Sequence, residues 1–297
     1  MDITTIILTY NEELHIKRCI ENAFKFSKEV FVIDSFSSDR TCDIAKEMGA
    51  SVVQHEFINQ AQQFQWAIDN CEIKTGWTLR LDADEYLTEE LISELDEKLP
   101  ALPEDVTGCY MLRRVVFMGK VLKYGILRKV RLLRIWRTGC ARMEQRWIDE
   151  HIVLTKGQSF CLRHLLLDHN LKGLDDFIIK HNNYSNREAF IEINRIYNLI
   201  EEKESTELKG RNKQKSFYYK LPRFFRAYLY FFVRYVVFLG FLDGRRGFIW
   251  LKLQAYWYRL LVDSKLYEME KKLGKHPSKE DVKAYVQKYW GINIFIV

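Results

Sequence analysis

The sequence predicts an α/β fold, a doubly wound mixed sheet followed by a helical C-terminal region. Three observations support this fold class. Short β-branched, apolar runs alternate with amphipathic stretches through residues 1–100. Acidic residues stand where two of those runs stop, as at Asp34 and Asp82. From Leu174 onward the pattern is helical.

The predicted elements follow one another with short links. Four strands are expected, at residues 3–9, 29–33, 51–54 and 77–81. Three helices are expected between them, at about 12–26, 40–48 and 60–71. Beyond Pro103, longer and partly exposed strands are expected at 108–118 and 129–137. The stretch 201–215 is so polar that it predicts a solvated helix end and linker.

A later segment, residues 221–242, is aromatic, apolar and basic at once. A membrane-spanning helix needs roughly 20 mainly apolar residues, and three arginines fall inside this window. The composition therefore favours an amphipathic helix in the membrane interface, over about 217–262. A core helix of a C-terminal subdomain is the alternative.

The composition of the chain favours some classes of binding partner over others. The 297 residues carry a formal charge of +6 with 16 Tyr, 19 Phe and 7 Trp, which suits an anionic small molecule or a membrane surface. No nucleic acid partner is expected, because the basic residues form no stripe. The six cysteines show no ligand spacing and are expected to be reduced core residues. The N-terminus shows no signal-peptide pattern, so we expect a cytoplasmic protein.

The acidic residues point to chemistry at one edge of the sheet. Asp34 follows the second strand, and Asp82 and Asp84 follow the fourth. In a doubly wound sheet they would share a crevice with Thr9 and the residues after it. Carboxylates there can accept hydrogen bonds from a pyrimidine or a ribose, and one can hold Mg²⁺ or Mn²⁺ against a diphosphate.

Three motifs resemble those of a known family. They are Ile7-Leu8-Thr9-Tyr10-Asn11-Glu12, Val32-Ile33-Asp34-Ser35-Phe36-Ser37-Ser38-Asp39-Arg40-Thr41 and Leu81-Asp82-Ala83-Asp84-Glu85. In order and spacing they resemble family 2 glycosyltransferases with the GT-A fold, especially bacterial enzymes of lipopolysaccharide core and exopolysaccharide assembly. The run Leu239–Phe248 resembles the C-terminal region of those proteins.

The resemblance implies roles for matching positions. Residues implied to hold the nucleotide are Thr9, Tyr10, Asn11, Glu12, Asp34 and Asp82, with Gln62 and Gln65 facing the donor. Asp84 is implied to bind the metal, Mn²⁺ or Mg²⁺. His169 would complete the metal shell or be an ordinary structural histidine. Asp39 lies in the same motif or only caps a helix.

An inverting transfer needs one base opposite the leaving diphosphate. The candidates are Glu150 and, as its rival, Asp149, in the polar run 144–151. A solvated loop without a catalytic part is the alternative. Arg128, Arg131 and Arg134 would face phosphate or lie on a solvated strand face.

The expected function is therefore a metal-dependent inverting glycosyltransferase that moves a sugar from a nucleotide diphosphate, with UDP as the expected nucleotide. The expected acceptor is a lipid-linked, lipopolysaccharide or exopolysaccharide glycan, reached at the cytoplasmic face of the inner membrane. The expected domains are a GT-A catalytic domain over 1–172, with a nucleotide-binding half (1–100) and an acceptor half (101–172), and a helical region over 173–297.

Two other functions fit the same residues. One is a catalytically silent membrane-bound sensor of nucleotide sugars, or an assembly scaffold. The other is a sugar nucleotidyltransferase, which would normally show a glycine-rich basic loop after the first strand. The sequence does not determine the sugar, the linkage or the oligomeric state.

Overall fold

The computed structural model describes residues 1–125, 130–144, 151–199, 218–274 and 277–292. The chain forms two compact units, each with its own hydrophobic core. One comprises Met1–Leu122 and Arg128–Leu171, and the other comprises Lys123–Leu127 and Lys172–Val297. The units are described here one at a time.

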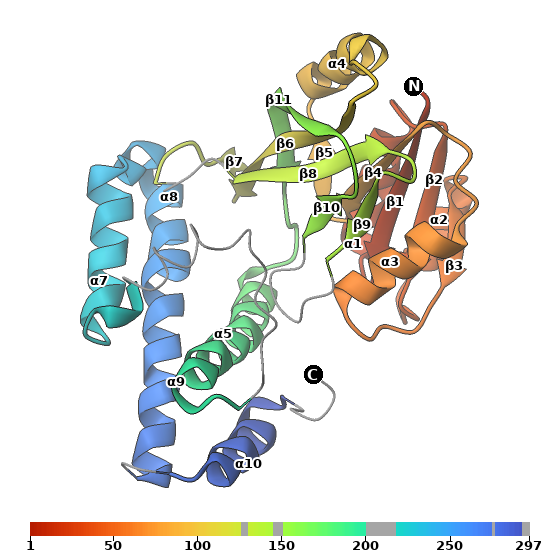
Figure 1. The fold of residues 1–297 in the computed structure, drawn as a ribbon. Coiled ribbons are helices and arrows are strands. Elements are labelled where there is room, and N and C mark those ends of the chain that lie inside the picture. Colours follow the sequence, from red (N-terminus) through yellow and green to blue (C-terminus); the bar gives the residue numbers. More distant parts are fainter. Residues whose placement is uncertain (126–129, 145–150, 200–217, 275–276, 293–297) are drawn as a thin grey trace. The chain divides into compact units, whose positions relative to one another are not determined.

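The first unit is built on a mixed sheet with the strand order β3-β2-β1-β4-β8-β6-β11-β5 (Figure 1). Its strands are β1 (Ile3–Thr9), β2 (Glu29–Asp34), β3 (Ser51–Gln54), β4 (Trp77–Asp82), β5 (Glu85–Leu87), β6 (Val106–Phe117), β7 (Lys120–Val121), β8 (Val130–Arg137) and β11 (Gln158–Asp168). The first four strands are parallel, and β8 runs antiparallel to β4 and β6. The predicted mixed α/β sheet is confirmed.

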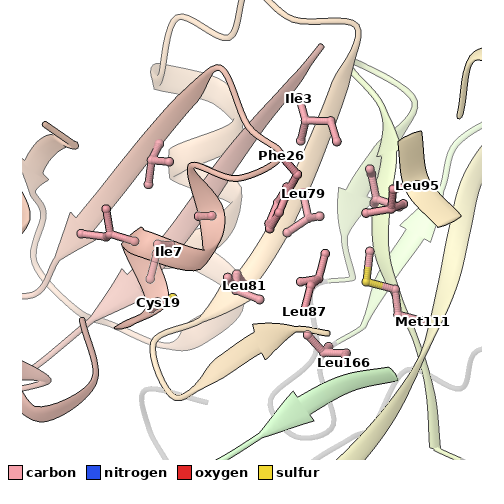
Figure 2. Close-up of a cluster of buried hydrophobic side chains, with 14 of the residues drawn as sticks. Ile3, Ile7, Cys19, Phe26, Leu79, Leu81, Leu87, Leu95, Met111 and Leu166 are labelled. Atoms are coloured by element: carbon pink, nitrogen blue, oxygen red, sulfur yellow. The ribbon is translucent and has the colours of Figure 1, made fainter. Parts of the chain in front are cut away.

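Helices cover both faces of this sheet. They are α1 (Glu13–Ala23), α2 (Thr41–Glu47), α3 (Gln60–Asn70) and α4 (Glu89–Lys98), which a 3₁₀ turn, η1 (Leu99–Ala101), extends. Alternate side chains of β1 enter opposite cores. Ile3 and Ile7 pack in one cluster with Cys19 of α1 (Figure 2), whereas Ile6 packs with Phe64 of α3. The strand is therefore buried on both sides, its threonines included.

The parallel register brings three strand ends to one edge. Thr9 at the end of β1 is opposite Asp34 at the end of β2. On the other side of β1, Leu8 is opposite Asp82 at the end of β4. The carboxyl ends of neighbouring parallel strands are where open α/β sheets bind ligands.

The second unit is helical. Its elements are α5 (Leu174–Tyr197), α7 (Phe225–Phe232), the π-helical turn η3 (Val233–Val237), the 3₁₀ turn η4 (Gly240–Asp243), α8 (Gly244–Leu251), the π-helical stretch η5 (Lys252–Trp257), α9 (Tyr258–Leu273) and α10 (Lys279–Trp290). Phe190 of α5, Leu266 of α9 and Val286 of α10 share one core. Arg226 is buried with them and donates to Asp263 and Glu192.

No single helix in the described part of the chain is long and apolar enough to cross a membrane. Phe225–Val237 and Gly240–Leu273 meet the length and composition criteria only as a pair, and the pair is bent by 72°. The polar stretch 201–215, predicted to be a linker, lies outside the described residues.

Candidate active site

Asp34 is held by donors of its own chain. It is fully buried, and its Oδ1 accepts hydrogen bonds from the hydroxyls of Thr9 (3.0 Å) and Ser37 (2.5 Å). Its Oδ2 accepts from the backbone N–H of Ser37 at 2.8 Å. Burial opposes ionisation, but the Ser37 and Thr9 hydrogen bonds outweigh it and lower the pKa of Asp34. A base or ribose that contacted Asp34 would therefore have to displace Ser37.

The segment after β1 is tied to the loop after β2. Asn11 adopts a left-handed backbone conformation, with φ 52°. Its N–H donates to the Ser37 hydroxyl at 2.8 Å, and its side-chain oxygen accepts from the Ser38 N–H at 2.9 Å. Tyr10 is 60% exposed and projects from the same turn. The two loops thus form one structure, and both Tyr10 and Phe36, which is 58% exposed, present accessible aromatic rings on it.

Asp39 connects the N-termini of two helices. Its carboxylate accepts from the N–H of Thr41 in α2 (3.0 Å) and from the N–H of Glu13 in α1 (3.2 Å). In return, the Glu13 carboxylate accepts from the Arg40 N–H at 3.2 Å. These contacts satisfy N–H groups that have no partner within their helices. The capping role is the one that the structure gives Asp39.

Asp82 forms part of a buried charge cluster. Arg134 of β8 donates to Asp82 Oδ2 at 2.8 Å and to Glu85 Oε1 at 2.7 Å. Arg80 of β4 donates to Asp82 Oδ1 at 3.3 Å. Both arginines are buried, and Glu85 is buried with them. Arg134 is therefore buried and pairs with carboxylates, so the predicted solvated strand face is wrong for this residue.

The cluster separates the pKa values of the two acids. Burial acts to raise the pKa of Asp82, but the charges of Arg134 and Arg80 outweigh it and lower this pKa. For Glu85, burial dominates and raises the pKa, despite the charge of Arg134. Asp82 is therefore the carboxyl of this pair that stays ionised.

Asp84 and His169 are neighbours. The His169 N–H donates to the Asp84 backbone carbonyl at 2.8 Å, where β11 ends beside β5. The Asp84 carboxylate is partly exposed and accepts from the Asn170 side chain at 3.4 Å. The structure thus brings together the two residues that the sequence implied as metal ligands.

Arg18 of α1 joins both of these residues. Its Nη2 donates to the backbone carbonyls of His169 (2.7 Å) and Asp84 (3.3 Å), and its Nη1 lies 3.1 Å from His169 Nδ1. Its guanidinium lies over the Tyr86 ring, 4.9 Å from the centroid. Burial and the Arg18 charge lower the pKa of His169. His169 is therefore a neutral imidazole at pH 7, and Nδ1 accepts from Arg18.

His15, three residues before Arg18 in α1, binds the segment that follows His169 after β11. The Leu171 N–H donates to His15 Nε2 at 2.7 Å. The ring proton is therefore on Nδ1, which donates to Glu12 Oε2 at 2.6 Å. Glu12 thus reaches the segment after β11 through a fully buried histidine.

This corner fits a divalent cation with few protein ligands. Among the residues that the structure describes, no group of three or more His, Cys, Asp or Glu side chains could hold a metal ion. Mg²⁺ commonly takes one or two carboxylates and completes its shell with substrate phosphates and water. The Asp84 carboxylate fits that requirement, and His169 Nδ1, which accepts from Arg18 Nη1, is the second candidate ligand. Asp82 fits less well, since two arginines already share its oxygens.

The base candidates Glu150 and Asp149 lie outside the described residues. They fall between β9 (Ala141–Met143) and β10 (Ile152–Leu154), which pair as an antiparallel hairpin. The Glu144 N–H donates to the His151 carbonyl at 2.8 Å, so the described ends of the intervening stretch are hydrogen-bonded to each other.

The two predicted glutamines of α3 differ in position. Gln65 accepts from the Met143 N–H at 2.8 Å and donates to Asp69, so its side chain supports β9. Gln62 is exposed on the first turn of the helix. The buried glutamine is Gln63, which donates to the Ser35 hydroxyl (3.2 Å) beside Asp34. The sequence analysis missed Gln63, although Ala61, Phe64 and Ala67 mark the buried face beside it.

Comparisons with known proteins show which sequences the chain resembles. The profile of the family described as Glycosyl transferase family 2 matches residues 4–167. The chain is 26% identical over 211 residues to the lipopolysaccharide core biosynthesis glycosyltransferase LpsC of Rhizobium meliloti, covering 67% of this chain and 77% of that protein. It is 33% identical over 114 residues to an uncharacterized glycosyltransferase of Rickettsia typhi, and the match covers 38% of each chain. The matched part thus spans 38% of the length of that relative.

A solved structure was also found among the similar proteins. It is glucosyl-3-phosphoglycerate synthase from Mycobacterium tuberculosis in complex with Mn²⁺, UDP and glucosyl-3-phosphoglycerate. The TM-score is 0.33 at 19% identity, over 38% of this chain and 44% of that one. A likeness of this size establishes neither an activity nor a ligand for the chain.

Proposed function

This chain belongs to glycosyl transferase family 2, and on that premise we propose that it transfers a sugar from a nucleotide diphosphate to a glycan acceptor. The observation that carries the proposal is the meeting of three strand ends at one edge of the sheet. Thr9 is opposite Asp34 there, its neighbour Leu8 is opposite Asp82, and Asp84 follows in the next turn. Ligands of open α/β sheets bind at such an edge.

The nucleotide is proposed to lie against the two joined loops. Tyr10 supplies an exposed ring on which a base can stack. Asp34, which also accepts from Thr9, holds Ser37, and Asn11 holds Ser38. The loop that would meet base and ribose is therefore organised before the donor binds. We propose UDP as the nucleotide, because uracil and ribose both present donors to acceptors of this kind.

The diphosphate is proposed to lie near Asp84 and His169. These residues would hold Mn²⁺ or Mg²⁺, which when bound neutralises the charge that develops on the leaving diphosphate. Arg18 and His15 fasten the backbone that carries both residues. The chain's own contribution at this corner is to orient the leaving group before transfer.

We propose Glu150 as the base that takes the proton from the acceptor hydroxyl, with Asp149 as its rival. Attack opposite the leaving diphosphate inverts the anomeric centre, and the proton passes to the carboxylate. Support comes from position alone. Both residues follow β9 in the sequence, and β9 is hydrogen-bonded to Gln65 of α3.

The proposed acceptor is a lipid-linked or lipopolysaccharide glycan. The relative LpsC is named for lipopolysaccharide core biosynthesis, and the aromatic, basic segment of the second unit suits a membrane surface. We accordingly propose that the protein works as a peripheral protein on the cytoplasmic face of the inner membrane.

Nucleotide release from a panel of UDP-, GDP- and TDP-sugars, with and without Mn²⁺, tests the proposal. Metal-dependent release from one nucleotide class, increased by a glycolipid acceptor, is expected. Binding of a nucleotide sugar without any release under these conditions would favour the sensor or scaffold instead.

A further inference from the structure

The helix pair of the second unit exposes a continuous apolar stripe. Phe225, Tyr228 and Phe232 of α7 are each more than half exposed. Their spacing of three and four residues places them on one face of the helix. Val236, four residues further in η3, continues that face to the bend between the helices.

The bend itself forms the apolar tip. Its side chains are at least 37% exposed although all are large and apolar: Val236, Val237, Phe238, Leu239, Phe241 and Leu242. A soluble protein rarely displays such residues together, and a contiguous apolar patch with a polar rim marks an interaction site.

The apolar tip is held in place from behind. The carboxylate of Asp243, which is buried, accepts from the N–H groups of Lys123 (2.9 Å) and Tyr124 (2.8 Å). Gly125 donates to the Phe238 carbonyl at 2.9 Å. A Cβ on Gly240 would lie 2.8 Å from the Arg234 carbonyl oxygen, so only glycine fits at that contact. The exposed side chains are thus presented by an ordered turn.

The backbone of the turn is hydrogen-bonded within the unit. Phe238 donates to Val233 at 2.9 Å, Leu239 to Val236 at 3.2 Å and Leu242 to Leu239 at 2.9 Å. Backbone groups that enter hydrocarbon must be satisfied in this way, because lipid offers them no partner. A protein partner could supply such hydrogen bonds itself, whereas lipid cannot.

Cationic side chains border the apolar tip. Arg245 and Arg246 follow it after Asp243 and Gly244, and both are exposed. Lys252 lies among aromatic rings, 4.4 Å from the centroid of Phe231 and 4.7 Å from that of Tyr256. Basic and aromatic residues beside an apolar surface match the charge of anionic headgroups and the polarity of the membrane interface.

We propose that the apolar tip inserts into the acyl layer of an anionic lipid surface, with Arg245 and Arg246 at the headgroups. The bend enters first, and the exposed stripe of α7 continues the apolar contact behind it. This inference deepens the lipid-linked part of the proposed function and rests on it for the choice of a lipid partner.

Vesicle flotation tests the proposal with the full chain. The variant Val237→Glu/Leu242→Glu changes two exposed residues, and Ile196→Glu, at an exposed residue of α5, is the matched control. Wild type and Ile196→Glu should float with vesicles of equal parts phosphatidylcholine and phosphatidylglycerol, and the double variant should remain unbound. Arg245→Gln should weaken binding to these vesicles about fivefold, because one basic residue near such a surface contributes about that factor.

Depth is measured with Val237→Trp and brominated acyl chains. Quenching of the new tryptophan beyond that of wild type is expected, and bromines near the bilayer centre should act on it. Flotation of the double variant at the wild-type level, or no added quenching, would overturn the proposal. The proposal would also be overturned if wild type were a dimer and the double variant a monomer. The apolar tip would then bind a second copy of the chain and not lipid.

Nucleotide release in the same preparations separates the two proposals. The double variant should keep wild-type release from the donor sugar without vesicles. If wild type floats but releases no nucleotide, the proposed function fails and the membrane contact stands. If release is normal but wild type does not float, the membrane contact alone fails.

Discussion

Arg134 donates through one nitrogen, Nη2, to two carboxylates, Asp82 at 2.8 Å and Glu85 at 2.7 Å. The arginine lies on β8, and the acids flank the turn between β4 and β5. The side chain therefore fastens the antiparallel half of the sheet to the turn that carries Asp84. The position of the candidate metal ligand depends on this pairing.

Replacing Arg134 should destabilise the first unit strongly. Arg134→Met leaves Asp82 and Glu85 without their shared partner, and breaking a buried pair from one side costs about 3–5 kcal/mol. Urea unfolding should show the loss. Arg131→Met, on the exposed part of the same strand, should change stability by less than about 0.5 kcal/mol. Equal effects of the two variants would contradict the pairing.

Asp34 should make stability depend on acid pH. Its hydrogen bonds lower its pKa below the ordinary 3.8. The unfolded state therefore binds more protons in this range, and stability falls as pH drops from 3.8 through the lower folded pKa. Asp34→Asn should be less stable at pH 7 by about 1.5–3 kcal/mol and should lose less stability on acidification. A parallel decline in both proteins, followed by thermal unfolding, would contradict this.

Arg18 should matter for metal affinity and not only for stability. Arg18→Met frees the backbone of Asp84 and His169, and groups that orient ligands typically contribute about 10–100-fold in metal affinity. Mn²⁺ binding in the presence of UDP, followed by electron paramagnetic resonance, should weaken by that factor.

Arg137→Met is the matched control for Arg18. Arg137 also donates to backbone carbonyls and lies over an aromatic ring, that of Trp77, but at the opposite end of β4. The Arg137→Met variant should be less stable than wild type but should bind Mn²⁺ with wild-type affinity. Similar metal affinities in the two variants would show that Arg18 is only structural.

Glu150→Gln should separate donor binding from transfer. The amide keeps the size of the side chain but cannot take a proton, so donor affinity should stay at the wild-type level. Transfer should fall by about 10²–10⁴-fold, the usual contribution of a positioned base. Asp149→Asn tests whether Asp149 is the base instead, because only one of the two variants should lose transfer. Undiminished transfer in Glu150→Gln would exclude it as the base.

The sequence predicted those parts of the site that depend on local pattern. The apolar and β-branched runs predicted the four parallel strands. Because the acids come where these runs stop, the sequence also placed them at the strand ends. The hydrogen bond from Thr9 to Asp34 follows from the parallel pairing of β1 and β2, which places the ends of the two strands side by side. Asp84 and His169 were predicted as joint metal ligands only through family resemblance, since they are 85 positions apart along the chain.

Other parts depend on tertiary contacts that leave no local signal. Arg80 and Arg134 alternate with apolar residues, a pattern typical of a solvated strand face. They are buried because the fold brings Asp82 and Glu85 to them. Gln63 differs from Gln62 and Gln65 only by the rotation of α3. Its burial follows from the packing of Phe64, not from the residue type.

The central claim is a metal-dependent transfer at the edge where β1, β2 and β4 end. Nucleotide release from the preferred donor sugar, titrated with Mn²⁺ for wild type and Asp84→Asn, tests it most directly. Nucleotide release by wild type should rise with Mn²⁺, and Asp84→Asn should lose that rise while remaining folded. A Mn²⁺ response unchanged in Asp84→Asn would contradict it.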